Sequence, residues 1–151
     1  MASNPDQFRI FAGTVRHTLD EKNRVTIPSR WRGEETGGFY AIADPRKAVV
    51  LLVLADELRR MTESIEALAD LSVSQKRAFT RQLFASARPC SIDKQGRMVL
   101  PPELCEQLGF SGEVMLAGTG TRIEVADPAV WEEMCEQEKE AYIQVAHNLG
   151  L

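Results

Sequence analysis

The stretches His17-Thr-Leu-Asp-Glu-Lys-Asn-Arg-Val-Thr-Ile-Pro28 and Cys90-Ser-Ile-Asp-Lys-Gln-Gly-Arg-Met-Val-Leu-Pro101 are two versions of one motif, 73 residues apart. The match extends outward at the same offset without a gap. The matched pairs are Phe11 with Phe84, Asp20 with Asp93, Arg24 with Arg97, Pro28 with Pro101, Leu58 with Trp131 and Met61 with Met134. An internal repeat of this kind predicts one small structural unit used twice.

Length and composition fit a small soluble protein built from two halves. The chain has 151 residues, of which 44% are hydrophobic and 26% charged. A half of roughly 60 residues buries only a marginal core, so we expect the halves to pack together and on other subunits. The apolar run 48–55 is too short for a membrane span. Residues 1–7 lack the features of a secretory signal, which favours a cytoplasmic protein.

Charge is segregated along the chain. The net charge is −4, but residues 127–151 alone carry −5. Residues 9–32 carry +4, and residues 71–92 contain four basic residues and no acid. Because local fields matter more for binding than the total, an anionic partner such as nucleic acid stays possible. Ordinary solvated faces would explain the same pattern.

The periodicity predicts an α+β protein in which each copy reads β-β-α-β-β-α. Pro28 suits the first turn of a short helix that runs through Trp31 and ends before Gly37. Apolar residues at spacings of three and four predict helices. The expected strands are 8–19, 25–27, 39–43, 49–54, 85–92, 97–100, 113–117 and 121–126, and the expected further helices are 56–71, 75–83, 101–108 and one from Pro128. Eight short strands could close a barrel if the copies intertwine.

Two helix starts carry capping signals. Ser74 is the expected N-cap of the helix 75–83, and Asp127 with Pro128 is the expected start of the last helix. The inward face of this last helix is predicted to hold Trp131, Met134, Cys135, Tyr142 and Val145. Cys90, Cys105 and Cys135 are odd in number and widely spaced, which favours reduced thiols over disulfides or a zinc site.

The repeated motif has the chemistry of a tight turn that presents an arginine. An Asp can accept backbone N–H groups within its own turn and pair with an Arg four residues later. A guanidinium held in this way suits two-pronged contacts to phosphate or guanine. Asn23 and Gly96 tolerate the positive φ that the turn requires, and Lys22 and Lys94 add charge.

The motif also allows a purely structural interpretation, in which the Asp–Arg pair only stabilises each turn and does not bind a ligand. The spacing alone is weak evidence, since Asp56 and Arg60 share it within a predicted helix, where it is an ordinary i,i+4 pair. An enzyme is not indicated. His17 and His147 lack evident nucleophile or metal partners, and no P-loop, dinucleotide-binding or zinc-protease motif is present.

The residues resemble a known family. Three segments, Phe11-Ala-Gly13, Leu19-Asp-Glu-Lys-Asn-Arg-Val-Thr-Ile-Pro-Ser-Arg-Trp-Arg32 and Ile92-Asp-Lys-Gln-Gly-Arg-Met-Val-Leu-Pro101, resemble the signatures of MraZ, a bacterial transcriptional regulator of the division and cell-wall gene cluster. The resemblance spans about residues 8–145. It implies SpoVT-AbrB-like repeats at 8–71 (core 14–58) and 85–146 (core 87–130), joined by a helix at 72–84. Residues 1–7 and 147–151 would be terminal tails.

The resemblance implies both fold and function. The fold would be a swapped-hairpin AbrB-like β-barrel with flanking helices, assembled into a ring-shaped homo-oligomer. The protein would be an autorepressor that binds G-rich direct repeats in promoter DNA, in the nucleoid, without a cofactor, metal or membrane. The expected DNA-binding residues are Arg24, Arg97, Lys22, Lys94, Arg16 and Arg30, and the loop-orienting residues are Asp20, Asp93, Asn23 and Gly96.

Some positions depart from the family pattern. Asn23 replaces the usual Gly, while Ala12 and Cys105 stand where the family often has Arg. Ala126 replaces a residue that is typically aromatic. Two alternatives therefore stay open: an antitoxin-like module that binds a partner protein, and a structural ring without DNA affinity. Because the first turn lies in the more basic half, Arg24 is expected to matter more than Arg97.

Overall fold

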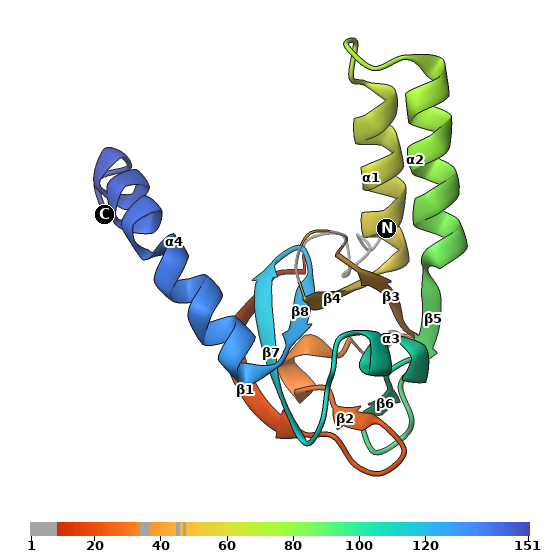
Figure 1. The fold of residues 1–151 in the computed structure, drawn as a ribbon, viewed down its shortest axis with the longest axis vertical. Helices are drawn as coiled ribbons and strands as arrows, with labels where there is room; N and C mark the ends of the chain where they lie inside the picture. Colours follow the sequence, from red (N-terminus) through yellow and green to blue (C-terminus); the bar gives the residue numbers. More distant parts are fainter. Residues whose placement is uncertain (1–8, 34–36, 45, 47) are drawn as a thin grey trace, which may run out of the picture.

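The computed structural model describes residues 9–33, 37–44, 46 and 48–151. It is an α+β protein, as predicted (Figure 1). The first copy contains β1 (Phe11–Thr18), β2 (Arg24–Thr26), the 3-10 turn η2 (Ser29–Trp31), β3 (Gly38–Ala43), β4 (Val49–Val53) and α1 (Ala55–Glu66). The helix α2 (Val73–Ser86) connects it to the second copy, which contains β5 (Arg88–Ser91), β6 (Arg97–Val99), α3 (Pro102–Gln107), β7 (Glu113–Gly120), β8 (Ile123–Ala126) and α4 (Pro128–Asn148).

The strands of the two copies pair with each other. β1 pairs with β7, β3 with β5, β4 with β8 and β2 with β6, all antiparallel. Among the described strands, only β3–β4 and β7–β8 pair within one copy. Each half therefore leaves strand edges that the other half covers, which explains why so small a repeat does not need to be stable alone.

The closed barrel expected from the resemblance is not found among the described strands. They form an open six-stranded sheet, in the order β1-β7-β8-β4-β3-β5, and a separate two-stranded ribbon of β2 and β6. The ribbon stays separate because β2 and β6 have three residues each and pair fully with one another. A bridge between Ile92 and Met98 connects the second copy's hairpin to the ribbon.

The core lies between the sheet and the ribbon and takes side chains from both copies. Phe11, Trp31 and Phe39 are its largest first-copy members, and Met98 and Leu116 come from the second copy. The ring of Phe11 meets Trp31 edge-on at 6.4 Å, and it meets Phe39 at 5.9 Å. Burying aromatic rings contributes strongly to stability. These first-copy rings share one core with Met98 and Leu116, and this shared core joins the halves.

The repeat is not exact outside the motif. Phe11 begins β1 and is buried, whereas Phe84 lies in α2 and is 47% exposed. The strand expected at 85–92 begins only at Arg88, because α2 continues through Ser86. The N-cap of α2 is Ser72, not Ser74: its hydroxyl accepts from the Gln75 N–H, and the Gln75 side chain accepts from the Ser72 N–H. This capping box satisfies two otherwise unpaired groups, which explains the earlier start.

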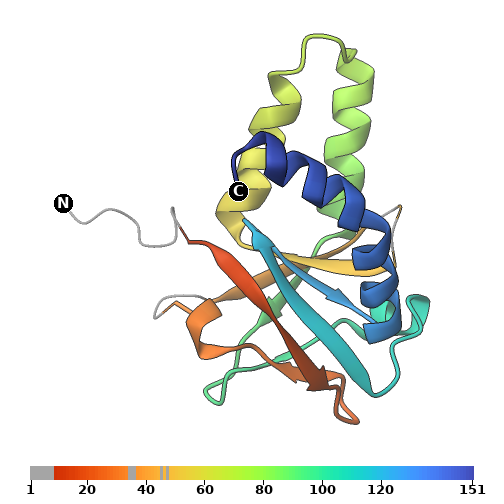
Figure 2. The same ribbon diagram turned by 90° about the vertical axis from the view of Figure 1, so that its left-hand side faces the viewer.

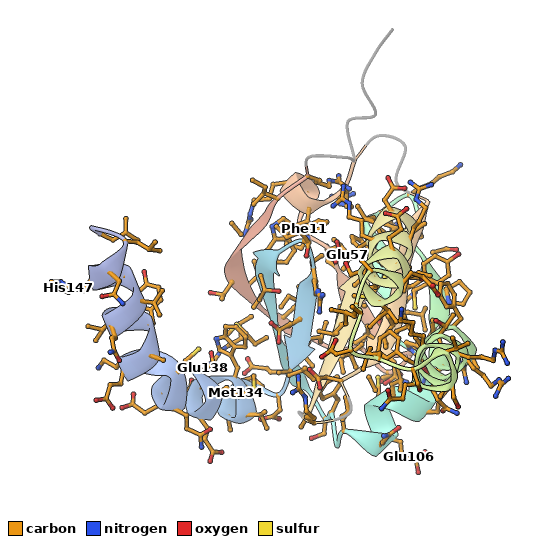
Figure 3. All side chains as sticks on the ribbon, turned by 90° about the horizontal axis from the view of Figure 1, so that it is seen from above. Phe11, Glu57, Glu106, Met134, Glu138 and His147 are labelled. Carbon is orange, nitrogen blue, oxygen red and sulfur yellow. The ribbon has the colours of Figure 1, made fainter. Side chains whose placement is uncertain are left out.

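The last helix begins as predicted but does not pack as predicted. Asp127 caps α4 by accepting from the Ala129 N–H, with Pro128 in the first turn. Trp131 and Met134 are half-buried, but Cys135 is exposed, and Tyr142 and Val145 are exposed as well. Figure 3 shows the reason: α4 lies near the sheet at Met134 and extends away from the body toward His147, so no other described part of the chain covers its far half.

The first short helix and the helix α1 are shorter than predicted. η2 is a single 3-10 turn that ends at Trp31, and the expected continuation at 34–36 lies outside the described residues. α1 ends at Glu66, and Leu68 is 44% exposed beyond it. Together α1 and α2 form a hairpin that projects from one end of the sheet (Figures 1 and 2).

Candidate nucleic-acid interface

The turn at residues 20–24, here called the first loop, is organised by one carboxylate. Asp20 Oδ1 accepts from the backbone N–H of Lys22 at 2.8 Å and of Arg24 at 3.0 Å. Its Oδ2 accepts from Arg24 Nε at 2.6 Å. Because the contact uses Nε, both terminal nitrogens of the guanidinium can donate to another acceptor, in the fork geometry that suits phosphate or guanine.

The turn at residues 93–97, here called the second loop, repeats this arrangement. Asp93 Oδ1 accepts from the N–H groups of Gln95 and Arg97, both at 2.9 Å. Asp93 Oδ2 accepts from Arg97 Nε at 3.0 Å. Two stretches 73 residues apart in sequence therefore fold into the same local structure, each with an arginine oriented by an aspartate.

Both loops contain one residue in the left-handed region, as predicted. Asn23 has φ 57° and Gly96 has φ 83°. Asn reaches this region more easily than most side chains do, and Gly reaches it freely. The backbone N–H of each residue closes the turn by donating to the carbonyl of Asp20 or Asp93, at 3.0 and 2.9 Å.

Hydrogen bonding also fixes the charge of the aspartates. The Arg24 backbone N–H, with smaller contributions from its side chain and from Lys22, lowers the pKa of Asp20 from 3.8 to about 2. The Arg97 backbone N–H lowers the pKa of Asp93 in the same way. Both carboxylates are therefore ionised near neutral pH and hold their arginines as charged pairs.

The ribbon of β2 and β6 places the two loops at its opposite ends. The first loop leads directly into β2 and the second leads directly into β6, and because these strands are antiparallel, Arg24 lies opposite Val99 and Arg97 lies opposite Thr26. Across the ribbon, Ile27 N–H donates to the Gly96 carbonyl at 2.9 Å, and Leu100 N–H donates to the Asn23 carbonyl at 2.8 Å. Both loops lie at the end of the molecule opposite the α1–α2 hairpin (Figures 1 and 2).

The other basic residues named from the sequence lie in different surroundings. Lys22 and Lys94 are exposed on the loops themselves. Arg16, in contrast, donates from Nη2 to Glu132 at 3.0 Å and lies 3.6 Å from Glu113. Arg30 is exposed, with its guanidinium 5.1 Å from the centre of the Trp31 ring. The structure thus groups the two lysines with the loops and ties Arg16 to acidic neighbours.

One residue near the second loop was missed by the sequence reasoning. A β-carbon built on Gly96 would lie 2.6 Å from Cζ of Arg32, so this first-copy guanidinium lies against the second loop. No local signal could have revealed the contact, because 64 residues separate the two positions. Pairing between β2 and β6 creates it.

The cysteines and histidines do not form a reactive centre within the described residues. Cys90 and Cys105 are buried free thiols, and burial raises the pKa of Cys90 to about 11. His17 Nδ1 lies 3.0 Å from the carbonyl oxygen of its neighbour Thr18. Among the same residues, no group of three His, Cys, Asp or Glu side chains is placed to hold a metal ion.

Comparison with known proteins identifies the family. The model described as "MraZ protein, putative antitoxin-like" matches residues 83–149. A transcriptional regulator MraZ of Carboxydothermus hydrogenoformans is 35% identical over 140 residues, covering 93% of this chain and 96% of that protein. The proteins of the same name from Syntrophomonas wolfei and Caldanaerobacter subterraneus are each 33% identical, covering 93% and 91% of this chain and 96% and 94% of those proteins.

The chain belongs to the MraZ family. The relatives are named transcriptional regulators, and MraZ membership therefore places the chain in a family of regulators rather than in an enzyme class. In the part of the chain that the structure describes, no helix is long and apolar enough to cross a membrane.

Proposed function

We propose that this MraZ-family chain is a sequence-specific regulator of transcription that binds double-stranded DNA through its first and second loops. In this proposal it represses its own promoter and the division and cell-wall gene cluster. Its target is a set of short, G-rich direct repeats. The two loops belong to AbrB-like repeats at 8–71 and 85–146.

One observation carries the proposal: arginines from both copies are fixed in the same way and lie on one ribbon. Arg24 and Arg97 are each anchored through Nε to an aspartate. Anchoring lowers the entropy lost when the guanidinium binds, and a forked donor matches the O6 and N7 acceptors of guanine in the major groove. Lys22 and Lys94 add exposed charge for phosphate contacts on either side.

The acidic character of the chain does not oppose this function. The acidic residues after position 127 lie on α4, which extends away from the body toward His147, at a distance from the two loops (Figures 1 and 3). Negative charge placed there leaves the loop face less acidic than the total suggests. It also weakens non-specific attraction to DNA.

The proposal includes a ring-shaped homo-oligomer. Support comes from exposed apolar side chains on the projecting helices, where a monomer gains nothing from them. On α2 these are Val73, Phe79 and Phe84, and on α4 they are Tyr142, Ile143 and Val145. Repeating a weak loop site around a ring makes each further DNA contact intramolecular, which raises avidity.

DNA binding to the chain's own upstream region tests the proposal. Fluorescence anisotropy would compare the parent with Arg24→Ala and Arg97→Ala, and each variant should lose about 5- to 100-fold in affinity, the range expected for a guanine contact. Binding should also weaken steeply as salt rises, because phosphate contacts release counterions. Arg59→Ala is the matched control, since Arg59 is exposed on α1 and pairs with Asp56 one helical turn away.

The outcomes separate the alternatives. If both loop variants bind as well as the parent, the loops do not read DNA. If the parent itself does not bind but light scattering shows a closed oligomer, the chain is a structural ring. A stoichiometric protein partner that is captured without DNA would favour the antitoxin-like module that the family description mentions.

A further inference from the structure

The second loop is covered by a side chain of the other copy. The guanidinium of Arg32 occupies the space that a side chain on Gly96 would fill: a β-carbon there would lie 2.6 Å from Cζ and 2.6 Å from Nη1. Gly96 is buried and Arg32 is half-buried as a result. A planar guanidinium packs well against a peptide plane, whereas the ammonium of a lysine does not.

The backbone that carries Arg32 is held firmly. Arg32 follows Trp31, which is 1% exposed in the core and donates from Nε1 to the Ala12 carbonyl at 3.2 Å. The Arg32 N–H itself closes the turn by donating to the Ser29 carbonyl at 3.1 Å. The side chain therefore starts from a fixed point and reaches across the ribbon to the second loop.

The position of Arg32 buries a polar atom, which costs free energy that some other contact has to offset. Its Nε is buried and has no hydrogen-bond partner among the described residues. Buried donors are nearly always paired, because an unpaired one loses its hydrogen bonds to water. Solvent would satisfy this group if the side chain turned outward, so the contact with the second loop must offset the loss.

The repeat offers an internal comparison. At the 73-residue offset, Arg32 corresponds to Cys105 and Gly96 corresponds to Asn23. Cys105 is a buried thiol whose pKa is raised by its burial, and its side chain carries no positive charge and no hydrogen-bonding fork to lay over the first loop. Asn23 is only half-buried. The loop with a covering arginine has Gly, and the loop without one has a side chain.

We propose that Arg32 is a positioning residue of the second loop: its guanidinium holds the 93–97 turn in the shape that presents Arg97, and it is the reason that position 96 is Gly while position 23 is Asn. The part of this inference that concerns DNA rests on the proposed function. The part that concerns the loop does not. A side chain at position 96 would displace the flexible end of Arg32 without disturbing the core.

Cleavage by a lysine-specific protease measures the two loops separately, because Lys22 and Lys94 provide one site in each. Arg32→Cys, which copies position 105, should raise the cleavage rate after Lys94 by roughly fivefold, the effect of losing one contact of ordinary strength. Cleavage after Lys22 should stay constant. Arg30→Cys removes an exposed charge two residues away and should change neither site.

The variant Gly96→Asn copies position 23 and should have the same effect as Arg32→Cys, since Asn tolerates the positive φ but displaces the guanidinium. Because both changes remove one contact, the double variant should be cleaved no faster than either single variant. The proposal would be overturned if the two single effects on the cleavage rate multiplied in the double variant. It would also be overturned if Arg32→Cys left the rate after Lys94 unchanged, or raised the rates after both lysines equally.

DNA affinity provides a second measurement. Arg32→Cys should weaken binding in the parent and have little further effect in the Arg97→Ala background, because the guanidinium acts through Arg97. An equal loss in both backgrounds would show that Arg32 acts independently and would contradict the positioning role. If the parent fails to bind DNA, the proposed function falls, while the cleavage pattern still decides the role of Arg32.

Discussion

The first and second loops share their turn but differ in what covers them. In each, an aspartate accepts two backbone N–H groups and one Nε–H, so the local geometry is nearly the same. The first loop has half-buried Asn23 at its tip, whereas Gly96 in the second loop is buried beneath Arg32. A motif repeated in sequence can therefore gain unequal surroundings, because tertiary contacts add a cation to only one copy.

This difference changes the expected ranking of the arginines. In the sequence, the first loop lies in the more basic half, and Arg24 was therefore expected to matter more for DNA binding than Arg97. In the structure, Arg16 of that half is tied to Glu113 and Glu132, and Arg32 lies on the second loop. One of the basic residues of the first half, Arg32, thus lies against the second loop and not the first.

The largest effect should follow from removing both arginines. The double variant Arg24→Ala/Arg97→Ala should lower affinity for the upstream DNA by about 100-fold or more, since each forked contact is worth about 1–3 kcal/mol. Anisotropy titration at fixed salt measures this loss. The melting temperature should stay close to that of the parent, because both side chains are partly exposed and each pairs only with the aspartate of its own turn in the contacts described above. If the double variant retains half of the parent's affinity, the two loops do not contribute to DNA binding in the way proposed.

The single variants should rank the loops. We expect Arg97→Ala to weaken binding more than Arg24→Ala, by roughly two- to fivefold, because Arg32 holds the second loop in the shape that presents Arg97. The same titration measures both, with Arg59→Ala as control. If Arg24→Ala weakens binding more, the basic residues near the first loop matter more for DNA affinity than the contact between Arg32 and the second loop.

The aspartates should titrate well below their usual range. Asp20 has a pKa of about 2 in the folded chain against 3.8 for the free residue. Since the folded value is the lower one, the ionised carboxylate stabilises the loop above pH 3.8, and this contribution disappears as the pH falls through about 2. Carboxyl NMR would measure the titration. Arg24→Ala should raise the pKa of Asp20 only part of the way, because the main cause is the backbone N–H, and should leave Asp93 unchanged.

The smallest effect should come from Asn23→Gly. Gly adopts the positive φ more freely but gains flexibility in the unfolded chain, so the free energy of unfolding should change by less than about 1 kcal/mol. Denaturant melting measures this change. A much larger loss would mean that the Asn23 side chain makes a contact of its own in the assembled protein, and the two tips would then differ for another reason.

Local features were largely predictable. Asp-x-x-x-Arg with a residue suited to positive φ specifies the turn from five neighbouring positions, and Asp127-Pro128 specifies the start of α4. Errors arose where a signal was ambiguous or depended on distant residues. The N-cap of α2 is Ser72 and not the predicted Ser74, because Gln75 stands three residues after Ser72 and completes the capping box. Tyr142 and Val145 follow a helical pattern, yet both side chains are exposed, because none of the described residues packs over them.

The sequence by itself determined the repeat, the two turns, the α+β class and the family, because these depend on hydrogen bonds and patterns within short segments. The tertiary structure alone decided that β1 pairs with β7, that β2 and β6 form a separate ribbon, and that Arg32 covers Gly96. Such contacts join residues far apart in the chain, and burial of a shared core selects them. Two loops of the same local design therefore became two different surfaces.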